Sequence, residues 1–146
     1  METELPYFEI TDAGDLIRIE LLGALHKDTE LTWDMNWLKS VVTVKGGQFQ
    51  GKYEAEFMRG DFSSFYKGLK RIYSDLKGSA NFNCLEDQLE ITFNGDGFGH
   101  FEIKCIAMDQ PGVGGRLEFT MGIDQTYLPT LFRQLQLITD KFPVIE

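Results

Sequence analysis

The chain has 146 residues, of which 42% are hydrophobic, so it is long enough for one domain with its own core and is not disordered in composition. Its formal net charge of −9 disfavours binding to nucleic acid or to an anionic membrane and favours a basic partner. The sequence lacks an apolar run of the roughly 20 residues that a membrane helix needs, and its start, Met-Glu-Thr-Glu, does not resemble a signal peptide. We therefore expect a cytoplasmic protein.

Hydrophobic alternation in the first half of the chain predicts four strands, with turns at residues 11–15 and at Gly46-Gly47. The strands are expected at Tyr7–Ile10, Leu16–Leu22, Trp37–Val44 and Phe49–Met58. Apolar residues then recur at steps of three and four over residues 62–77, which predicts an amphipathic helix. Asp61 is the expected N-cap of this helix and Gly78 the expected C-cap glycine.

The second half predicts the same order of elements. Strands are expected at Ser79–Cys84, Gln88–Phe93, Gly99–Met108 and Arg116–Asp124. A second helix is expected over Tyr127–Lys141, with Asp124 or Thr126 as its cap. Pro129 falls in the first turn of this helix, where proline is tolerated.

The last strand and helix of each half correspond at a spacing of 66 residues. Tyr53, Ala55 and Phe57 correspond to Phe119, Met121 and Ile123, and the stripe Phe62, Phe65, Leu69, Ile72 and Leu76 to Leu128, Leu131, Leu135, Ile138 and Phe142. Short turns require antiparallel pairing, and each helix has one apolar face. We predict a two-layer α+β fold of about eight mostly antiparallel strands with both helices on one face. Residues 1–146 would form a single domain, with a pseudo-repeat of 1–78 and 79–146.

The residues that catalysis and metal binding require are scarce. The histidines, His26 and His100, fall in a loop and in a strand, and Cys84 and Cys105 fall on apolar positions that predict buried free thiols. The glycine-rich stretches 94–99 and 110–116 lack the residues that would complete a calcium or phosphate loop and are expected to be turns. The carboxylate pairs Glu54/Glu56 and Glu86/Asp87 are of the type used in acid–base chemistry, but Glu54 and Glu56 share an outward strand face, which favours simple solvent exposure. We assign no catalytic residue, metal or cofactor, and we expect a protein that is not an enzyme.

Acidic residues gather near the start of the chain. Residues 1–36 contain nine acids against Arg18 and Lys27, a net charge of −7. In the loop that follows the second strand, carboxylates surround a tryptophan, a combination that suits an interface with a basic partner. The candidate partner-binding residues are Asp12, Asp15, Asp28, Glu30, Trp33 and Asp34. An alternative for Trp33 is that it fills the edge of the sheet; Leu137 is expected to be exposed, opposite the apolar stripe of its helix.

Two motifs resemble a known family. The first is Asn36-Trp37-Leu38 before a valine-rich strand, followed by Gly47-x-Phe49-x-Gly51. The second is Asp124-Gln-Thr-Tyr-Leu-Pro129, followed by Leu131-x-x-x-Leu135 and Lys141-Phe142-Pro143. Together they resemble the Wap-type bacterial immunity proteins, partners of contact-dependent toxins, over nearly the whole chain. The resemblance implies a small cytoplasmic protein that binds and neutralises a toxic nuclease domain, and it carries no binding residue over to this chain.

The leading hypothesis is therefore a non-enzymatic protein-binding protein, an immunity protein that neutralises a cognate toxin. The acidic surplus supports it independently, because nuclease domains are often basic in order to bind phosphate. The alternative is a stand-alone structural or small-ligand-binding domain. The sequence leaves the oligomeric state and the identity of the toxin open.

Overall fold

The computed structural model describes residues 5–25 and 36–145. Predictions made for His26, Asp28, Glu30, Trp33 and Asp34 lie outside the described residues. The elements are β1 (Tyr7–Asp12), β2 (Asp15–Ala24), β3 (Trp37–Gly46), β4 (Phe49–Met58), α1 (Arg59–Asp75), β5 (Lys77–Phe82), β6 (Leu89–Asp96), β7 (His100–Met108), β8 (Arg116–Asp124), the 3-10 turn η2 (Gln125–Tyr127) and α2 (Leu128–Lys141). β4 and β8 begin and end at the predicted residues, and the other strands differ by a few residues at their ends.

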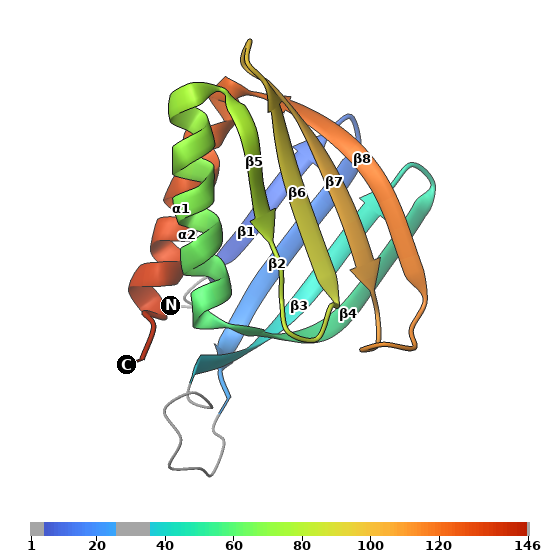
Figure 1. Ribbon diagram of the computed structural model, residues 1–146. Helices are drawn as coiled ribbons and strands as arrows, with labels where there is room; N and C mark the ends of the chain where they lie inside the picture. Colours follow the sequence, from blue (N-terminus) through green and yellow to red (C-terminus); the bar gives the residue numbers. More distant parts are fainter. Residues whose placement is uncertain (1–4, 26–35, 146) are drawn as a thin grey trace.

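The eight strands form two antiparallel sheets, with the orders β1-β2-β3-β4 and β5-β6-β7-β8 (Figure 1). The predicted α+β class and the antiparallel pairing are confirmed. The strands divide into two sheets because each strand pairs with its neighbour in sequence, whereas α1 separates β4 from β5. Each sheet is therefore a simple meander of hairpins.

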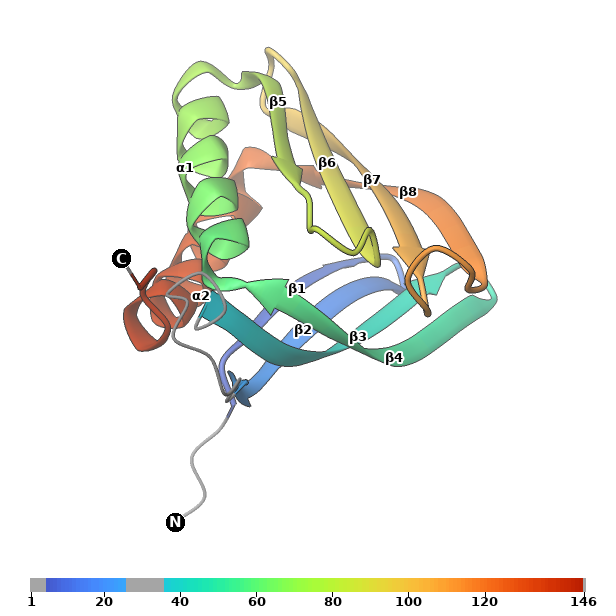
Figure 2. The same cartoon turned by 60° about the horizontal axis from the view of Figure 1, so that its bottom comes forward.

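Both helices lie on the same side of the two sheets, as predicted, and pack against each other (Figure 1). Figure 2 shows the sheets spreading apart toward the helices, which fill the open side. α1 packs along β5, and α2 packs along β1, so each helix covers the first strand of one sheet. None of the described helices is long and apolar enough to cross a membrane.

Aromatic rings join the two sheets in the core. Phe57 on β4 and Phe82 on β5 are in edge contact, with centroids 5.3 Å apart. Phe62 and Phe65 on α1 lie 5.2 and 5.6 Å from the same Phe82 ring. All four side chains are almost fully buried, and the edge-to-face pairs that Phe82 makes with Phe57 and Phe65 add to the stabilisation from burial. The connection through Phe82 makes one core out of two sheets.

The predicted spacing of 66 residues appears in the burial pattern. The buried residues of α1 are Phe62, Phe65, Leu69 and Ile72, and those of α2 are Leu128, Leu131, Leu135 and Ile138. The preceding strands also match, since Tyr53 and Phe119 are both half-buried. The spacing does not extend further toward the N-terminus, because the connection 109–115 between β7 and β8 is longer than the turn at 47–48 between β3 and β4.

Both predicted caps of the first helix are wrong. The first helix begins at Arg59, and its N-cap is Met58. Asp61 is the third residue of the helix, and its Oδ2 accepts a hydrogen bond from the Met58 N–H at 2.9 Å. The carboxylate still lies near the positive end of the helix, but it reaches back to the N-cap as the third residue of a capping box does.

The C-cap of the same helix is Leu76, which has a left-handed φ of 60°, and Gly78 lies within β5. A left-handed conformation is unfavourable for leucine, and hydrogen bonds on both sides hold it. Leu76 N–H donates to Ile72 O at 2.7 Å, and Leu76 O accepts from Gly97 N–H at 2.8 Å. The contact with the β6–β7 turn therefore ends the helix before the glycine is reached.

The predicted cap of the second helix, Asp124 or Thr126, is also wrong, because α2 begins at Leu128 and its N-cap is Tyr127, which makes no side-chain capping bond. The Asp124 carboxylate accepts from the Thr126 N–H at 2.8 Å and opens η2, which leads into α2 with Pro129 in the first turn. Cys84 and Cys105 are buried free thiols, as predicted.

Candidate functional site

Asp12 and Asp15 flank the turn between β1 and β2, and each carboxylate accepts a hydrogen bond from another hairpin. Asp12 Oδ2 accepts from the N–H of Gly122 on β8 at 3.3 Å, which joins the two sheets. Asp15 Oδ1 accepts from the N–H of Gly47, between β3 and β4, at 2.9 Å. Asp12 is exposed and Asp15 is half-buried. Both predicted binding residues therefore also hold hairpins in place.

The segment with the other four predicted binding residues, 26–35, connects the far end of β2 to β3. The described residues at its two ends are held firmly: Leu25 N–H donates to Trp37 O at 3.0 Å, and Asn36 exchanges two bonds with Ile145, of 2.8 and 3.1 Å. β2 has ten residues, which corresponds to about 33 Å. Leu25 is thus separated by the length of β2 from Asp15.

A hollow of about 480 Å³ lies beside Leu25. Its charged lining residues are Glu54, Glu56, Glu86, Asp109 and Lys39. Among the described residues that line the hollow, Lys39 is the one cation beside these four carboxylates, and its Nζ lies 3.8 Å from Glu54 Oε1. We call this surface the acidic hollow. It provides a concentrated negative field of the kind that attracts a basic partner.

The strand period places two of these carboxylates. Ala55 and Phe57 point into the core from β4, so Glu54 and Glu56 point outward, as the alternation predicts. Glu54 is exposed, and Glu56 is half-buried. Glu86 comes from the connection between β5 and β6, and Asp109 from the start of the connection between β7 and β8. The acidic hollow therefore combines residues of both sheets.

Gln88 fixes the floor of the acidic hollow. Its side chain is buried, and Nε2 donates to Glu54 O at 3.4 Å and to Asp109 O at 3.3 Å. Its own carbonyl accepts from the Tyr53 hydroxyl at 2.5 Å. Burial raises the pKa of Tyr53, so the phenol stays protonated and remains a donor. These bonds connect β4 to the β5–β6 connection, which carries Glu86, and to the β7–β8 connection, which carries Asp109. The acidic hollow is therefore preformed.

A second negative region surrounds the exposed His100. A hollow of about 570 Å³ there is lined by residues that include Asp12 and Asp124. The Thr126 hydroxyl and N–H lower the pKa of Asp124, and the Phe98 N–H lowers the pKa of Asp96. His100 Nδ1 lies 3.5 Å from Asp96 Oδ2. The carboxylates of this region add to the negative charge at this end of the protein, and those of Asp96 and Asp124 stay ionised to lower pH than free aspartate.

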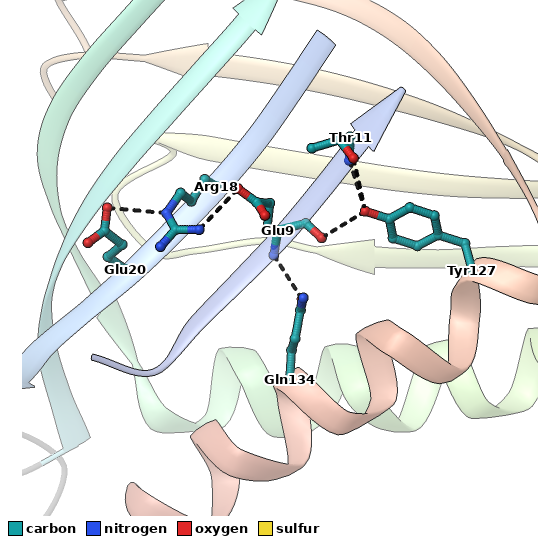
Figure 3. A network of polar contacts seen from close by, with 6 residues as sticks. All are labelled: Glu9, Thr11, Arg18, Glu20, Tyr127 and Gln134. Carbon is teal, nitrogen blue, oxygen red and sulfur yellow. Dashed lines mark hydrogen bonds and ion pairs between the residues drawn. The ribbon is translucent and has the colours of Figure 1, made fainter. Parts of the chain in front are cut away.

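A polar network covers the outer edge of β1 (Figure 3). Gln134 Oε1 accepts from the Glu9 N–H at 2.9 Å, and the Tyr127 hydroxyl accepts from the Thr11 N–H at 3.0 Å and donates to Glu9 O at 3.4 Å. Arg18 crosses the sheet face, with Nη1 3.0 Å from Glu9 Oε1. Side chains from α2 and η2 thus satisfy backbone groups that an edge strand otherwise leaves open.

The described residues offer little for catalysis. Between residues 5 and 25 and between 36 and 145, no group of three or more His, Cys, Asp or Glu side chains could hold a metal ion. Burial raises the pKa of Cys105 to about 12 and also raises the pKa of Cys84, so both are thiols at neutral pH rather than nucleophilic thiolates. Of the glycine-rich stretches, 110–116 connects β7 to β8, as predicted, whereas the first half of 94–99 belongs to β6 and only residues 97–99 form the turn to β7.

The sequence alone misses two surfaces of this protein. The acidic hollow depends on Glu86 and Asp109, which are remote from Glu54 in sequence, and only the Glu54/Glu56 alternation was readable beforehand. The second is a groove between the start of β1 and α2, described below. Its signal was the exposed Leu137, which the helical period places opposite the buried stripe and which is 65% exposed.

The sequence is similar to that of a known family along nearly its whole length. The model of the immunity protein WapI-like family matches residues 8–143. No curated protein matches the chain.

Two solved structures share the fold. Crystal structures of Trypanosoma bruciei MRP1/MRP2 include a chain with 16% sequence identity and a TM-score of 0.51, over 94% of this chain and 85% of that one. A guide-RNA-binding protein complex bound to a gRNA includes a chain with 15% identity and a TM-score of 0.50, over 94% of this chain and 92% of that one. At these identities the likeness shows the arrangement of sheets and helices and nothing of the function.

Proposed function

Because the chain belongs to the WapI-like immunity protein family, we propose that it is a non-enzymatic immunity protein that neutralises a cognate nuclease toxin by direct contact. Family membership gives an immunity role in general terms. The proposal adds that the protein acts by direct contact, that its toxin is a nuclease, and that it acts in the cytoplasm of a bacterial cell.

The observation that carries the nuclease proposal is the acidic hollow. A nuclease domain needs basic residues to hold phosphate, and a protein of net charge −9 that concentrates carboxylates in a preformed hollow complements such a surface. The same charge opposes nucleic-acid binding by this chain, although a protein of similar fold is seen with RNA. The partner is therefore proposed to be a basic protein.

We assign the partner surface to the acidic hollow and to the segment 26–35, which carries Asp28, Glu30, Trp33 and Asp34. Leu25, which lines the hollow, directly precedes that segment. Asp12 and Asp15 lie at the other end of β2, where they add to the long-range field that steers a basic partner. Trp33 is proposed to be the apolar anchor among these charges.

A titration against the toxin domain encoded in the neighbouring reading frame tests this proposal. Purified protein is added in increasing amounts to a fixed amount of nuclease, and the remaining DNA or RNA cleavage is measured. Inhibition complete at one molar equivalent supports neutralisation by contact. Lasting inactivation by a small fraction of an equivalent would instead show catalysis. Absence of both inhibition and binding would contradict the pairing, and the stand-alone ligand-binding alternative would then lead.

A further inference from the structure

One residue of the β1 edge is left open where its neighbours are covered. Leu21 N–H donates to Pro6 O at 2.9 Å, so the alternate residues Tyr7, Glu9 and Thr11 direct their backbone groups away from β2. The outward N–H groups of Glu9 and Thr11 are bonded by α2 and η2 side chains (Figure 3). For Tyr7, the described part of the chain provides no hydrogen-bonding partner for the N–H or the C=O.

The open position faces a groove. The space between the start of β1 and α2 measures about 660 Å³, within the usual range for binding sites. It is lined by Leu5, Pro6 and Tyr7 on one side and by Thr130, Arg133, Gln134, Leu137, Asp140 and Lys141 on the other. Leu5 and Leu137 are 39% and 65% exposed, so an apolar side chain placed in the groove would bury both.

The ring of Tyr7 is held in position from the outer sheet face. The Arg18 guanidinium lies 4.2 Å from the centroid of the Tyr7 ring, and Arg18 is itself held by Glu9 and by Glu20, at 3.0 and 3.3 Å. A fixed ring keeps the neighbouring backbone groups aligned for pairing. The open edge is therefore preorganised, which lowers the entropic cost of binding.

The groove has a different charge from the rest of the protein. Among the described residues that line the groove, Arg133 and Lys141 are accompanied by a single carboxylate, that of Asp140, whereas the chain as a whole carries −9. Arg133 donates from Nη2 to Thr130 Oγ1 at 3.2 Å, which leaves its other N–H groups for a ligand. A ligand that complements the groove would carry a carboxylate beside an apolar side chain.

We propose that this groove binds an extended, acidic peptide segment of a protein partner, which adds to β1 at Tyr7 as a short additional strand. The free backbone donor and acceptor select an extended polypeptide, the two leucines select an apolar side chain, and Arg133 with Lys141 select a flanking carboxylate. This site is separate from the acidic hollow, and the inference does not depend on the proposed nuclease partner.

A second copy of this chain fits the groove less well. A two-fold dimer through β1 would bring Arg133 and Lys141 toward their own copies, so that like charges would meet. An extended acidic segment does not meet this obstacle. We therefore commit to the segment as the occupant, and self-association becomes an outcome that the experiment can detect.

Binding of short peptides to the full-length protein tests the proposal. The probe is fluorescein-labelled Glu-Val-Leu-Val-Glu, compared with Lys-Val-Leu-Val-Lys and with a form of the acidic peptide N-methylated at both valines. Fluorescence anisotropy gives the Kd, and the NMR signal of the Tyr7 amide reports the location. The variants are Leu137→Glu and Arg133→Glu, with Leu85→Glu as the matched control, because Leu85 is 66% exposed and lies outside the groove. Thermal melts establish that each variant folds.

The acidic peptide should bind at least about tenfold more tightly than the basic one and than the N-methylated one. Leu137→Glu and Arg133→Glu should weaken binding by a similar factor, while Leu85→Glu should not. Equal binding of the N-methylated peptide would overturn strand addition. Absence of binding by the acidic peptide at millimolar concentration would overturn the proposal, as would a concentration-dependent dimer that Leu137→Glu abolishes.

Discussion

Leu69 and Leu135 lie 66 positions apart, and both are fully buried at the centres of α1 and α2. Each lies in the stripe that packs its helix against the rest of the core. The two helices also contact each other, so the equivalent leucines support the same central packing from two sides.

Truncation of either leucine should therefore be costly. Leu69→Ala and Leu135→Ala should each lower the free energy of unfolding by about 2–5 kcal/mol, because each leaves a cavity in a closely packed core. Leu137→Ala is the control on α2: its side chain is 65% exposed, so the change should be within about 0.5 kcal/mol. Denaturant melts measure all three. Losses at Leu69 and Leu135 as small as that of Leu137 would contradict the packing described here.

Asp61 should make stability depend on pH in an unusual direction. Burial raises the pKa of its carboxyl from 3.8 to about 6, against the lowering effect of the Met58 N–H. The folded protein then binds this proton more tightly than the unfolded protein does. The contribution of Asp61 to stability is full below the unfolded value, near pH 4, and is lost as the pH rises through about 6.

Asp61→Asn keeps an acceptor for the Met58 N–H and removes the charge. It should raise the free energy of unfolding at about pH 7.5 and flatten the fall in stability between about pH 4 and 6. Asp75→Asn, an exposed position on the same helix, serves as the control and should change neither. Denaturant melts across this pH range make the comparison. An Asp61→Asn curve parallel to that of the parent protein would show that the carboxyl is not perturbed.

Tyr127→Phe should expose the edge of β1. The change removes the hydroxyl that bonds the Thr11 N–H and the Glu9 carbonyl, and it should cost about 1 kcal/mol. Amide hydrogen exchange at Thr11 should become faster than in the parent protein. Tyr66→Phe is the matched control, since the described residues give its hydroxyl no hydrogen bond. Equal exchange rates at Thr11 in both variants would mean that Tyr127 does not protect the edge.

The sequence predicted the elements of this fold better than their contacts. Hydrophobic periods placed both helices and all eight strands, because burial of one face dominates the choice of local structure. The C-terminal end of α1 was missed because Leu76, which ends the helix before Gly78, is held by a bond from Gly97 that exists only in the folded chain. The N-terminal end was missed because the bond between Asp61 and the Met58 N–H, although local, suits the third residue of a helix, and Asp61 was assigned as the N-cap. The division into two sheets likewise depends on which strands pair.

For the candidate surfaces too, single residue positions were predicted from the sequence, whereas the contacts between them were not. The outward position of Glu54 and the exposure of Leu137 follow from strand and helix periods and were predicted. The approach of Asp109 to Glu54 requires Gln88 to bridge their carbonyl groups, and no local pattern reports such a bridge. The backbone groups of Tyr7 stay open because the side chains of Gln134 and Tyr127, from the C-terminal part of the chain, bond the N–H groups of Glu9 and Thr11 instead. Such long-range contacts cannot be read from the sequence.

If Trp33 is the apolar anchor of the partner surface, its removal should act on the dissociation rate. Trp33→Ala should speed dissociation from the toxin domain by at least about tenfold and change association little, because loss of an anchor shortens the lifetime of the complex. Surface plasmon resonance separates the two rates. A dissociation rate equal to that of the parent protein would favour the alternative that Trp33 fills the edge of the sheet.

In the proposed mode of action, the acidic hollow and the segment 26–35 receive a basic toxin. The most direct measurement is the rate of association with the toxin domain encoded next to this chain, at low and high salt. Two variants reverse charges on the proposed surface: one replaces Asp28, Glu30 and Asp34 with Lys, and one replaces Glu54 and Glu86 with Lys. The control replaces Glu90 and Glu102 with Lys, which are exposed on β6 and β7 and do not line the acidic hollow.

Both surface variants should keep the melting temperature of the parent protein and associate at least about tenfold more slowly at low salt, with a smaller difference at high salt, because charge complementarity acts mainly on the association rate. The control, with the same change in charge as the Glu54 and Glu86 variant, should be slowed much less. Association rates in the surface variants equal to that of the control would contradict the assigned surface, and failure of the parent protein to bind that domain would contradict the claim itself.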